Sequence, residues 1–232
     1  MLRKKLIVLW NLLLDKILLV MIRVIIADDH AVVRTGIKLI FDSTADLTIV
    51  DEVDKGNDLL NKIKKNDYDV VILDLCMPGK DGFETLKLIK EEKPGLPVVI
   101  FSMNPEDQYA IRMIKAGASA YVNKESPAEE LMKAIRTVAQ NKKYYTPAQS
   151  ELMMDYINNE NSGKLDPHER LSDREFQVMR LLASGIKKKK IAEDLSVSIN
   201  TISNHRNNIL KKMDLTSNSE ITRYAIQHGL IE

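Results

Sequence analysis

Residues 24–30 read VIIADDH, an apolar run that ends abruptly at two adjacent carboxylates, Asp28 and Asp29. A continuous apolar run of this length is typical of a strand that is buried on both faces, as in a parallel sheet. Neighbouring acidic side chains repel each other, so their position where a strand leaves the core indicates that a cation or a reaction uses them. The stretch therefore predicts a parallel α/β fold with a polar site at one edge of its sheet.

The same pattern of short apolar runs and amphipathic stretches continues to about residue 141. The apolar runs predict strands at 22–27, 48–53, 69–74, 97–102 and 119–123. The amphipathic stretches predict helices at 31–43, 56–65, 83–92, 106–116 and 127–141. We expect Ser126 to cap the last helix, with Pro127 at its first position. Strands that alternate with helices predict a doubly wound α/β domain, in which ligands bind beyond the carboxyl ends of the strands.

Polar residues stand at the ends of four of these predicted strands. Asp28 and Asp29 follow the first strand, Asp74 ends the third, Ser102 ends the fourth, and Lys124 follows the fifth. Three carboxylates at one edge need a cation, and hard oxygen ligands suit Mg²⁺. No Gly-rich phosphate loop follows the first strand, so a nucleotide or flavin site is not indicated. Asp74 is placed to act as a nucleophile that forms an aspartyl phosphate, with Lys124 and Ser102 contacting the phosphoryl oxygens.

The C-terminal part of the chain has a different pattern, with no predicted strand. Ser172 to Glu175 reads as a capping box that opens a helix ending at Gly185, and Ser217 to Glu220 reads as a second box that opens a helix ending at Gly229. Between them we predict helices at 188–195 and 199–212, joined by a three-residue turn. Two helices joined in this way form a helix-turn-helix, whose second helix enters the major groove of DNA.

Composition and charge support a division into two domains. The chain has 232 residues, of which 44% are hydrophobic, so it can form buried cores and is not a disordered protein. Cys76 is the single cysteine, which fits a reducing cytoplasm. Residues 168–232 carry 11 Lys and Arg against 8 Asp and Glu, which makes this part the better candidate for binding a polyanion. We therefore predict one domain at 21–146, a linker at 147–167 that begins with a short helix, and a second domain at 168–232.

Residues 1–20 read MLRKKLIVLWNLLLDKILLV, a basic start followed by apolar residues, as in a signal peptide or membrane anchor. Asn11, Asp15 and Lys16 interrupt the run, and a central Asp or Lys costs about 2.5–3.5 kcal/mol in a membrane helix. No small-x-small cleavage site follows. We expect translation to begin at Met21 and no membrane association. If residues 1–20 are made, an apolar helix on the domain or at a membrane surface is the alternative.

Four motifs occur in order in the first domain: the DD pair, LDLCMPGKDG around Asp74, FSM at Ser102, and KAGASAYVNK ending at Lys124. On these motifs residues 21–143 resemble the receiver domain of bacterial response regulators. The resemblance implies a flavodoxin-like five-stranded sheet of order 2-1-3-4-5 and phosphorylation of Asp74 by a sensor histidine kinase. It implies that Mg²⁺ is bound by Asp29, Asp74 and the backbone carbonyl of Cys76, with Asp28 acting largely through water. It also implies that Ser102 and Tyr121 form a switch pair and that Lys124 pairs with the phosphoryl group.

The stretches LSDREFQVMRLLASG, IAEDLSVSINTISNHRNNILKKM and ITRYAIQHGLI resemble the LuxR-type DNA-binding domain of NarL/FixJ-class regulators. The resemblance implies that the helix from about 199 to 212 reads the DNA. Base edges would be contacted by Ser203, Asn204 and Asn207. Thr201, His205, Arg206 and Lys211 would lie near the DNA backbone, and Lys187 and Lys188 would also bind DNA. Lys190 departs from the family, which usually has Glu there; four consecutive lysines raise non-specific attraction to phosphate and the salt sensitivity of binding.

Together these features predict a transcriptional regulator of a two-component phosphorelay that is not an enzyme, apart from slow autodephosphorylation of Asp74. Its expected partners are a sensor histidine kinase, promoter DNA and, when phosphorylated, a second copy of the chain, with RNA polymerase as a further candidate. One alternative is a phosphatase of the haloacid dehalogenase type, which needs a second Asp where Cys76 stands. Others are a DNA-binding protein that ignores phosphate and a membrane-tethered variant that uses residues 1–20. We interpret His30 as a loop residue rather than a ligand.

Overall fold

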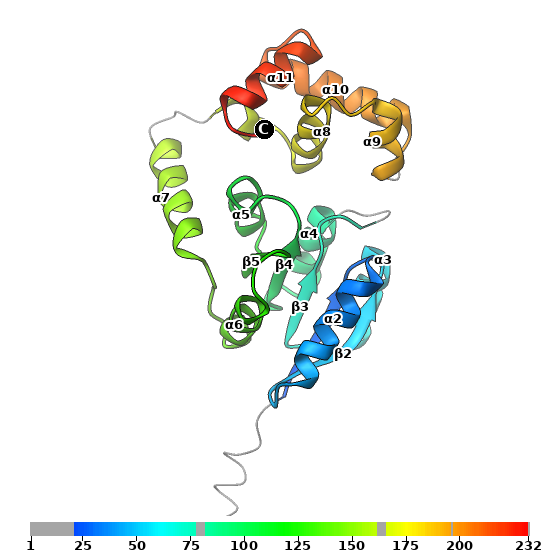
Figure 1. Cartoon of the computed structure of the whole chain (residues 1–232), viewed down its shortest axis with the longest axis vertical. Helices are drawn as coiled ribbons and strands as arrows, with labels where there is room; N and C mark the ends of the chain where they lie inside the picture. The colour runs from blue at the N-terminus through cyan, green and yellow to red at the C-terminus, as the bar shows by residue number, and fades with distance from the viewer. Residues whose placement is uncertain (1–20, 78–81, 162–165, 196, 232) are drawn as a thin grey trace, which may run out of the picture.

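The computed structural model describes residues 21–77, 82–161, 166–195 and 197–231, which form an α/β domain and a helical domain stacked on it (Figure 1). The predicted N-terminal extension at 1–20 lies outside the described residues. So do residues 78–81 of the Asp74 motif, residues 162–165 within the predicted linker, and the turn residue Ser196. Within the described part of the chain, no helix has the length and apolar character needed to cross a membrane.

The N-terminal domain is built on a five-stranded parallel sheet. Its strands are β1 (Ile22–Ala27), β2 (Leu47–Val53), β3 (Val70–Leu73), β4 (Val98–Ser102) and β5 (Ala120–Asn123). Their order is β2-β1-β3-β4-β5, and every neighbouring pair is parallel. The predicted doubly wound, flavodoxin-like sheet is confirmed. Because β1 lies directly beside β3, the residues that follow these two strands are brought together at one edge of the sheet.

Helices cover both faces of the sheet, and two separate apolar cores result. One face carries α2 (Ala31–Asp42) and α6 (Ala128–Ala139), and the other carries α3 (Gly56–Lys65), α4 (Gly82–Glu92) and α5 (Glu106–Lys115). Side chains alternate between faces along a strand, so Val24 and Ile26 enter the first core while Ile25 enters the second. All three are fully buried, which is why the strand is apolar at every position.

Two of the predicted helix boundaries are wrong. The predicted cap Ser126 does not cap α6; Pro127 occupies the N-cap position and the helix starts at Ala128. Ser126 instead belongs to the preceding turn, where its N–H donates to the Asn123 carbonyl at 3.0 Å. The short helix expected at the start of the linker is the 15-residue α7 (Pro147–Asn161). It is joined to the sheet by Gln149, a buried residue whose amide donates to the Tyr121 carbonyl at 2.8 Å.

The C-terminal domain contains the four predicted helices, preceded by a short 3₁₀ turn. The elements are η1 (Pro167–Arg170), α8 (Asp173–Ala183), α9 (Lys188–Asp194), α10 (Ile199–Met213) and α11 (Asn218–Gln227). The predicted capping box at Ser172 is present in full. At the second predicted box the Ser217 hydroxyl accepts from the Glu220 N–H, but the Glu220 carboxylate accepts from the Thr216 N–H, one residue earlier than expected. The helix-turn-helix is thus formed by α9 and α10.

Candidate phosphorylation site and DNA-binding surface

The polar residues predicted at the sheet edge form one buried cluster. Asp28 and Asp74 have side chains that are 1% and 2% exposed, and both contact the Lys124 ammonium. Lys124 Nζ lies 2.7 Å from Asp28 Oδ2 and 2.8 Å from Asp74 Oδ2. The other oxygen of Asp74, Oδ1, is buried and has no hydrogen-bond partner among the described residues. Two buried carboxylates therefore share one cation, and one carboxylate oxygen at the centre of the cluster is left available.

The charges in this cluster perturb each other. Burial raises the pKa of Asp74 above its ordinary 3.8 and Asp28 adds to the rise, while Lys124 opposes it without cancelling it. Burial lowers the pKa of Lys124, but the two carboxylates more than compensate and hold it above its ordinary 10.5. The cluster has more acidic than basic groups. Lys124 therefore keeps its proton more firmly than usual, while ionisation of the buried Asp74 carboxyl is less favourable than usual. Such perturbed groups are common where chemistry takes place.

Asp29 and His30 lie at the open side of the cluster. Asp29 is partly exposed, and His30 Nδ1 lies 2.9 Å from Asp29 Oδ1 and 3.1 Å from Asp28 Oδ1. Ligand atoms of Asp28, Asp29, His30 and Asp74 all fall within 4.8 Å of one another. The structure thus brings together the three carboxylates predicted as metal ligands. His30, which we had interpreted as a loop residue, contacts two of them.

The predicted switch residues, Ser102 and Tyr121, are both fully buried and both contact Asn104. The Tyr121 hydroxyl donates to the Asn104 carbonyl at 2.8 Å, and the Asn104 N–H donates to Ser102 Oγ at 3.3 Å. The backbone N–H of Lys124 donates to the Ser102 carbonyl at 2.9 Å. Asn104 was missed by sequence reasoning, because it acts through its backbone in a loop and carries no residue-type signal. It joins the acidic cluster to the start of α5.

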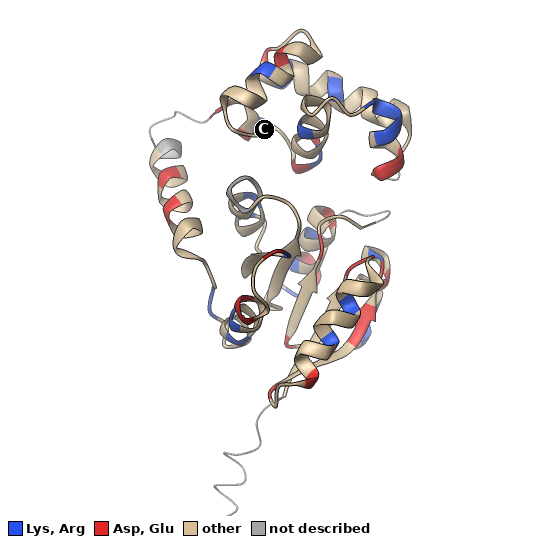
Figure 2. Cartoon of the chain, viewed as in Figure 1, with Lys and Arg blue, Asp and Glu red and all other residues tan. Residues whose placement is uncertain are grey.

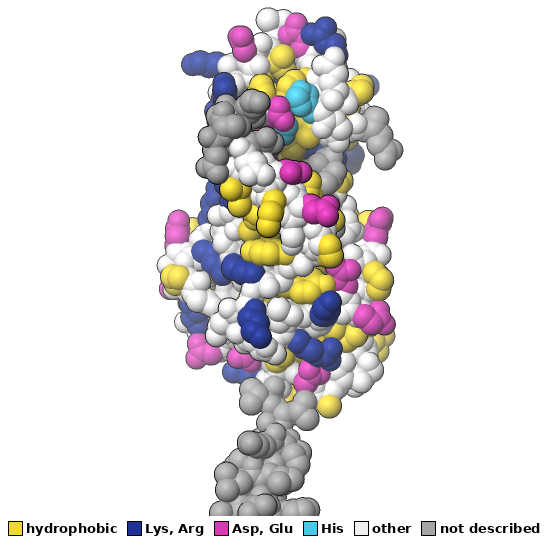
Figure 3. Space-filling view, turned by 90° about the vertical axis from the view of Figure 1, so that its left-hand side faces the viewer, with side chains coloured by type: hydrophobic (Ala, Val, Ile, Leu, Met, Phe, Trp, Pro, Cys, Tyr) yellow, Lys and Arg dark blue, Asp and Glu magenta, His cyan; other side chains and the backbone are white. Residues whose placement is uncertain are grey.

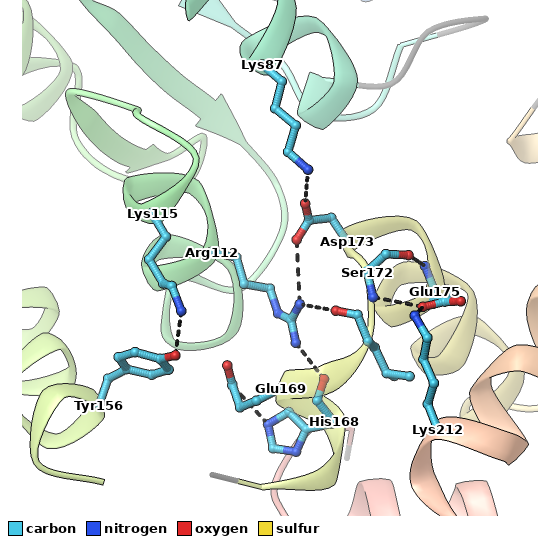
Figure 4. A network of polar contacts seen from close by, with 11 residues as sticks. Lys87, Arg112, Lys115, Tyr156, His168, Glu169, Ser172, Asp173, Glu175 and Lys212 are labelled. Atoms are coloured by element: carbon cyan, nitrogen blue, oxygen red, sulfur yellow. Dashed lines mark hydrogen bonds and ion pairs between the residues drawn. The ribbon is translucent and has the colours of Figure 1, made fainter. Parts of the chain in front are cut away.

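Arg112 of α5 connects the two domains (Figure 4). Its side chain is 8% exposed, and its guanidinium donates to the Leu171 carbonyl at 3.0 Å and to the His168 carbonyl at 2.7 Å. It also lies 3.5 Å from Asp173 and 4.1 Å from the centre of the Phe176 ring. A buried guanidinium with several partners is a specific contact rather than a loose surface pair. The α5 helix therefore contacts the DNA-binding domain along its side, and Asn104, which contacts both predicted switch residues, lies two residues before its start.

The space between the acidic cluster and the second domain is a cavity of about 260 Å³. Asp29, Cys76 and Asn104 line it from the sheet edge, and Arg174 and Arg180 line it from α8. Arg180 also lies 5.4 Å from the Tyr109 ring of α5. The helical domain thus stands directly over the predicted phosphorylation site, with two arginines facing the same space.

The predicted DNA-binding residues lie on α10, on α9 and at the N-cap of α9, and Figure 2 colours basic residues along both helices. Ile202, Ile209 and Met213 turn one side of α10 into the core. The predicted base-reading residues Asn204 and Asn207 are exposed, as are Lys187 and Lys211. The remaining predicted contacts are partly buried: Thr201, Ser203, His205, Arg206 and Lys188.

Some of these partly buried side chains already have partners within the domain. Arg206 Nε donates to the Asn218 side chain of α11 at 2.6 Å, and Lys188 Nζ donates to Ser203 Oγ at 3.4 Å. Burial lowers the pKa of His205 below its ordinary 6.5, and Arg174 adds to the decrease. Contact of Arg206 or Lys188 with phosphate therefore requires these internal contacts to be exchanged or shared.

Comparison with known proteins agrees with this arrangement. Residues 24–136 match the response regulator receiver domain, and residues 169–225 match the bacterial regulatory proteins of the luxR family. The chain belongs to the response regulators that join a receiver domain to a LuxR-type DNA-binding domain, and it is a DNA-binding regulator of a two-component system.

Individual relatives cover nearly the whole chain. The oxygen regulatory protein NreC of Staphylococcus epidermidis is 37% identical over 216 residues, which is 90% of this chain and 99% of that protein. NreC of Staphylococcus carnosus is 34% identical over 215 residues, with the same coverage. Among solved structures, RcsB of Salmonella enterica serovar Typhimurium bound to a promoter in the presence of phosphomimetic BeF₃⁻ is 30% identical. It covers 88% of this chain and 97% of its own, with a TM-score of 0.55.

Proposed function

We propose that Asp74 accepts a phosphoryl group from a sensor histidine kinase and that this modification controls promoter binding by α10. The state of the Asp74 carboxylate carries the proposal: Oδ2 is held by Lys124 at 2.8 Å, while Oδ1 is buried without a hydrogen-bond partner among the described residues. Lys124 orients Oδ2, and no hydrogen bond to a described residue competes with a new bond at Oδ1. In the transfer, a carboxylate oxygen bonds to phosphorus as the P–N bond of the donor histidine breaks, and the nitrogen keeps the electron pair.

The residues at the site fit a magnesium ion. Asp28, Asp29 and Asp74, with the backbone carbonyl of Cys76, would hold it, since the carboxylate oxygens are hard ligands within 4.8 Å of one another. When bound, Mg²⁺ neutralises charge on the phosphoryl oxygens. His30 Nδ1 contacts carboxylate oxygens of Asp28 and Asp29, so an ion at this site would compete with it for those oxygens. Lys124, already between two carboxylates, is placed to exchange its contact with Asp74 for one with the phosphoryl group.

The route from the site to the DNA-binding domain runs through α5. Phosphorylation draws the Ser102 hydroxyl toward the new phosphoryl oxygens, which displaces the Asn104 backbone that Ser102 and Tyr121 both hold. Asn104 lies two residues before the start of α5 at Glu106, so its movement shifts the helix that carries Arg112. We infer that the Arg112 contacts with the Leu171 and His168 carbonyls weaken, and that the DNA-binding domain is released.

The released domain binds promoter DNA in the cytoplasm, as a dimer on paired half-sites. The α10 helix enters the major groove, with Ser203, Asn204 and Asn207 toward the bases. Contacts with RNA polymerase follow from binding at a promoter. The protein performs no turnover of its own beyond slow hydrolysis of the aspartyl phosphate.

The test combines purified full-length protein, Mg²⁺ and acetyl phosphate, with DNA fragments selected from genomic DNA by the treated protein. We expect acid-stable, base-labile phosphate on Asp74 and tighter DNA binding after treatment. Asp74→Asn should abolish both, and chelation of the metal should prevent labelling. Asp42→Asn, an exposed residue at the end of α2, is the matched control and should behave as wild type.

Two outcomes would refute the proposal. Labelling that persists in Asp74→Asn would assign the phosphoacceptor elsewhere. Equal DNA affinity for wild type and Asp74→Asn, with and without acetyl phosphate, would favour a DNA-binding protein that ignores phosphate. The proposed route through α5 has a separate test. Arg112→Ala should raise the DNA affinity of the unphosphorylated protein. Lys87→Ala is the control and should change the affinity little, because the exposed Lys87 side chain contacts Asp173 at 3.2 Å.

A further inference from the structure

Histidine and acidic side chains gather where the chain enters the DNA-binding domain, on the face shown in Figure 3. Asp166 and His168 flank Pro167 at the start of η1, and His228 follows the end of α11. One ligand atom from each of these three residues falls within 4.8 Å of the other two. A cavity of about 270 Å³ adjoins them and is also lined by Glu169. None of these residues belongs to the phosphorylation site.

The separations within the group are compatible with ligands around one ion. His228 Nδ1 lies 3.7 Å from Asp166 Oδ1, which is too far for a hydrogen bond. His168 Nε2 lies 3.4 Å from Glu169 Oε1, which is a long and weak contact. Two ligands at about 2.1 Å from a tetrahedral ion stand about 3.4 Å apart. A small cation between the imidazoles and carboxylates would satisfy both separations.

The side chains are also held in place, as metal ligands usually are. Pro167 fixes the backbone between Asp166 and His168. His168 is nearly buried, and its Nδ1 lies 2.9 Å from the Tyr224 hydroxyl, while the ring of His228 stacks on that of Tyr224 at 4.1 Å. Such outer contacts orient the ligating imidazoles in metal sites. In Figure 4 the His168 ring extends toward Glu169 and away from the Arg112 guanidinium.

We propose that Asp166, His168 and His228 bind a divalent transition metal ion of the zinc class, with Glu169 or water as a fourth ligand. Two imidazoles with carboxylates favour zinc, nickel or copper over the magnesium expected at the oxygen-only site. Because the Tyr224 hydroxyl holds Nδ1 of His168, the proposed ligand atom is Nε2, which lies beside Glu169. The ion joins the end of the interdomain linker to the end of α11, next to the His168 carbonyl that Arg112 holds.

The test titrates full-length protein with Co²⁺ in millimolar Mg²⁺, which occupies the acidic cluster at Asp74. Visible absorption distinguishes tetrahedral cobalt with nitrogen ligands from octahedral cobalt at oxygen sites, and added Zn²⁺ should bleach the signal. We expect one equivalent to bind. His228→Ala and Asp166→Asn should each lower zinc affinity at least tenfold. Both residues are exposed enough for the fold to survive these changes.

His205→Ala removes a histidine of α10 outside both clusters and should leave zinc affinity unchanged. Asp29→Asn, at the phosphorylation site, should also leave zinc affinity unchanged. Failure of the proposed function can therefore be distinguished from failure of the proposed zinc site. The proposal is overturned if wild type binds no zinc in the presence of Mg²⁺. It is equally overturned if His228→Ala and Asp166→Asn bind zinc as tightly as His205→Ala does.

Discussion

Two carboxylates, one in each domain, are almost equally buried but differ in how they are satisfied. Glu175 of α8 accepts from the Ser172 N–H at 2.8 Å and from Lys212 at 2.6 Å, and its pKa lies below the ordinary 4.5 despite burial. Asp74 shares Lys124 with Asp28, retains an open oxygen, and has a raised pKa. A buried carboxylate whose hydrogen bonds are all made stabilises the fold. A buried carboxylate with an unpaired oxygen can bind a further group, such as a metal ion or a phosphoryl group.

The largest effect is expected from removing the shared cation. Lys124→Met leaves Asp28 and Asp74 buried without it, and breaking a buried pair from one side costs about 3–5 kcal/mol. Urea unfolding at pH 7 without divalent ions measures the loss. Lys62→Met is the matched control, because Lys62 pairs with Asp51 at a partly exposed position where such pairs contribute about 0–1 kcal/mol. Similar losses in the two variants would show that the cluster is solvated rather than buried.

A smaller loss is expected at the satisfied carboxylate. Glu175→Ala removes a charged acceptor from Lys212 and from the Ser172 N–H, at a cost of about 1.5–3 kcal/mol. Because the folded-state pKa of Glu175 is lowered, its contribution is present above pH 4.5 and is lost as the pH falls through the folded pKa. The free-energy difference between wild type and variant should therefore shrink on acidification. A difference that grows at low pH would contradict this assignment.

The unsatisfied carboxylate should show the opposite sign. The folded-state pKa of Asp74 is raised, so the native state binds more protons and loses stability as the pH rises above 3.8. Asp74→Asn removes this penalty and should stabilise the metal-free protein by about 0.5–2 kcal/mol at pH 7, the size of gain common at functional sites. Below pH 3.8 the two proteins should be equally stable. If Asp74→Asn is less stable than wild type at pH 7, the ionised Asp74 stabilises the fold as Glu175 does, and the predicted opposite sign is wrong.

The smallest effect is expected at Lys190, an exposed residue that pairs with Asp194 at 2.6 Å within α9. Lys190→Glu should leave unfolding almost unchanged and lower DNA affinity, with the dependence of affinity on salt reduced by about one ion. Binding measured at several salt concentrations tests this. Affinity that rises in the Glu variant would mean that Lys190 disturbs the domain instead of assisting binding.

Sequence patterns predicted the sheet and the acidic cluster because the local apolar pattern of each strand and the parallel order of the strands both determine where these residues lie. A strand buried on both faces is apolar throughout, and parallel strands deliver their terminal residues to one edge. Asp28, Asp74 and Lys124 could therefore be assigned to one site without coordinates. The residue roles assigned to that site, and those of the DNA-binding residues, stay predictions until measured.

Other features depend on how distant segments pack, and no local pattern records that. Arg112 reads as an ordinary basic residue of an amphipathic helix, yet it is buried between domains. The length of α7 was underestimated because its later turns are held by α5, where Lys115 contacts Tyr156, and its own sequence does not record that contact. Ser126 was predicted as a cap from its residue type, but it lies in the turn before α6, which begins after Pro127.

The firm attachment of α7 limits how far the DNA-binding domain can travel. If phosphorylation releases the DNA-binding domain as proposed, the chain length from Asn161 to Asp166 lets Asp166 move at most about 18 Å from the end of α7. A tether this short keeps the separated surfaces at an effective concentration on the order of millimolar. After hydrolysis of the phosphoryl group, the contacts between Arg112 and the DNA-binding domain would then re-form within a single molecule. This return would not depend on the cellular concentration of the protein.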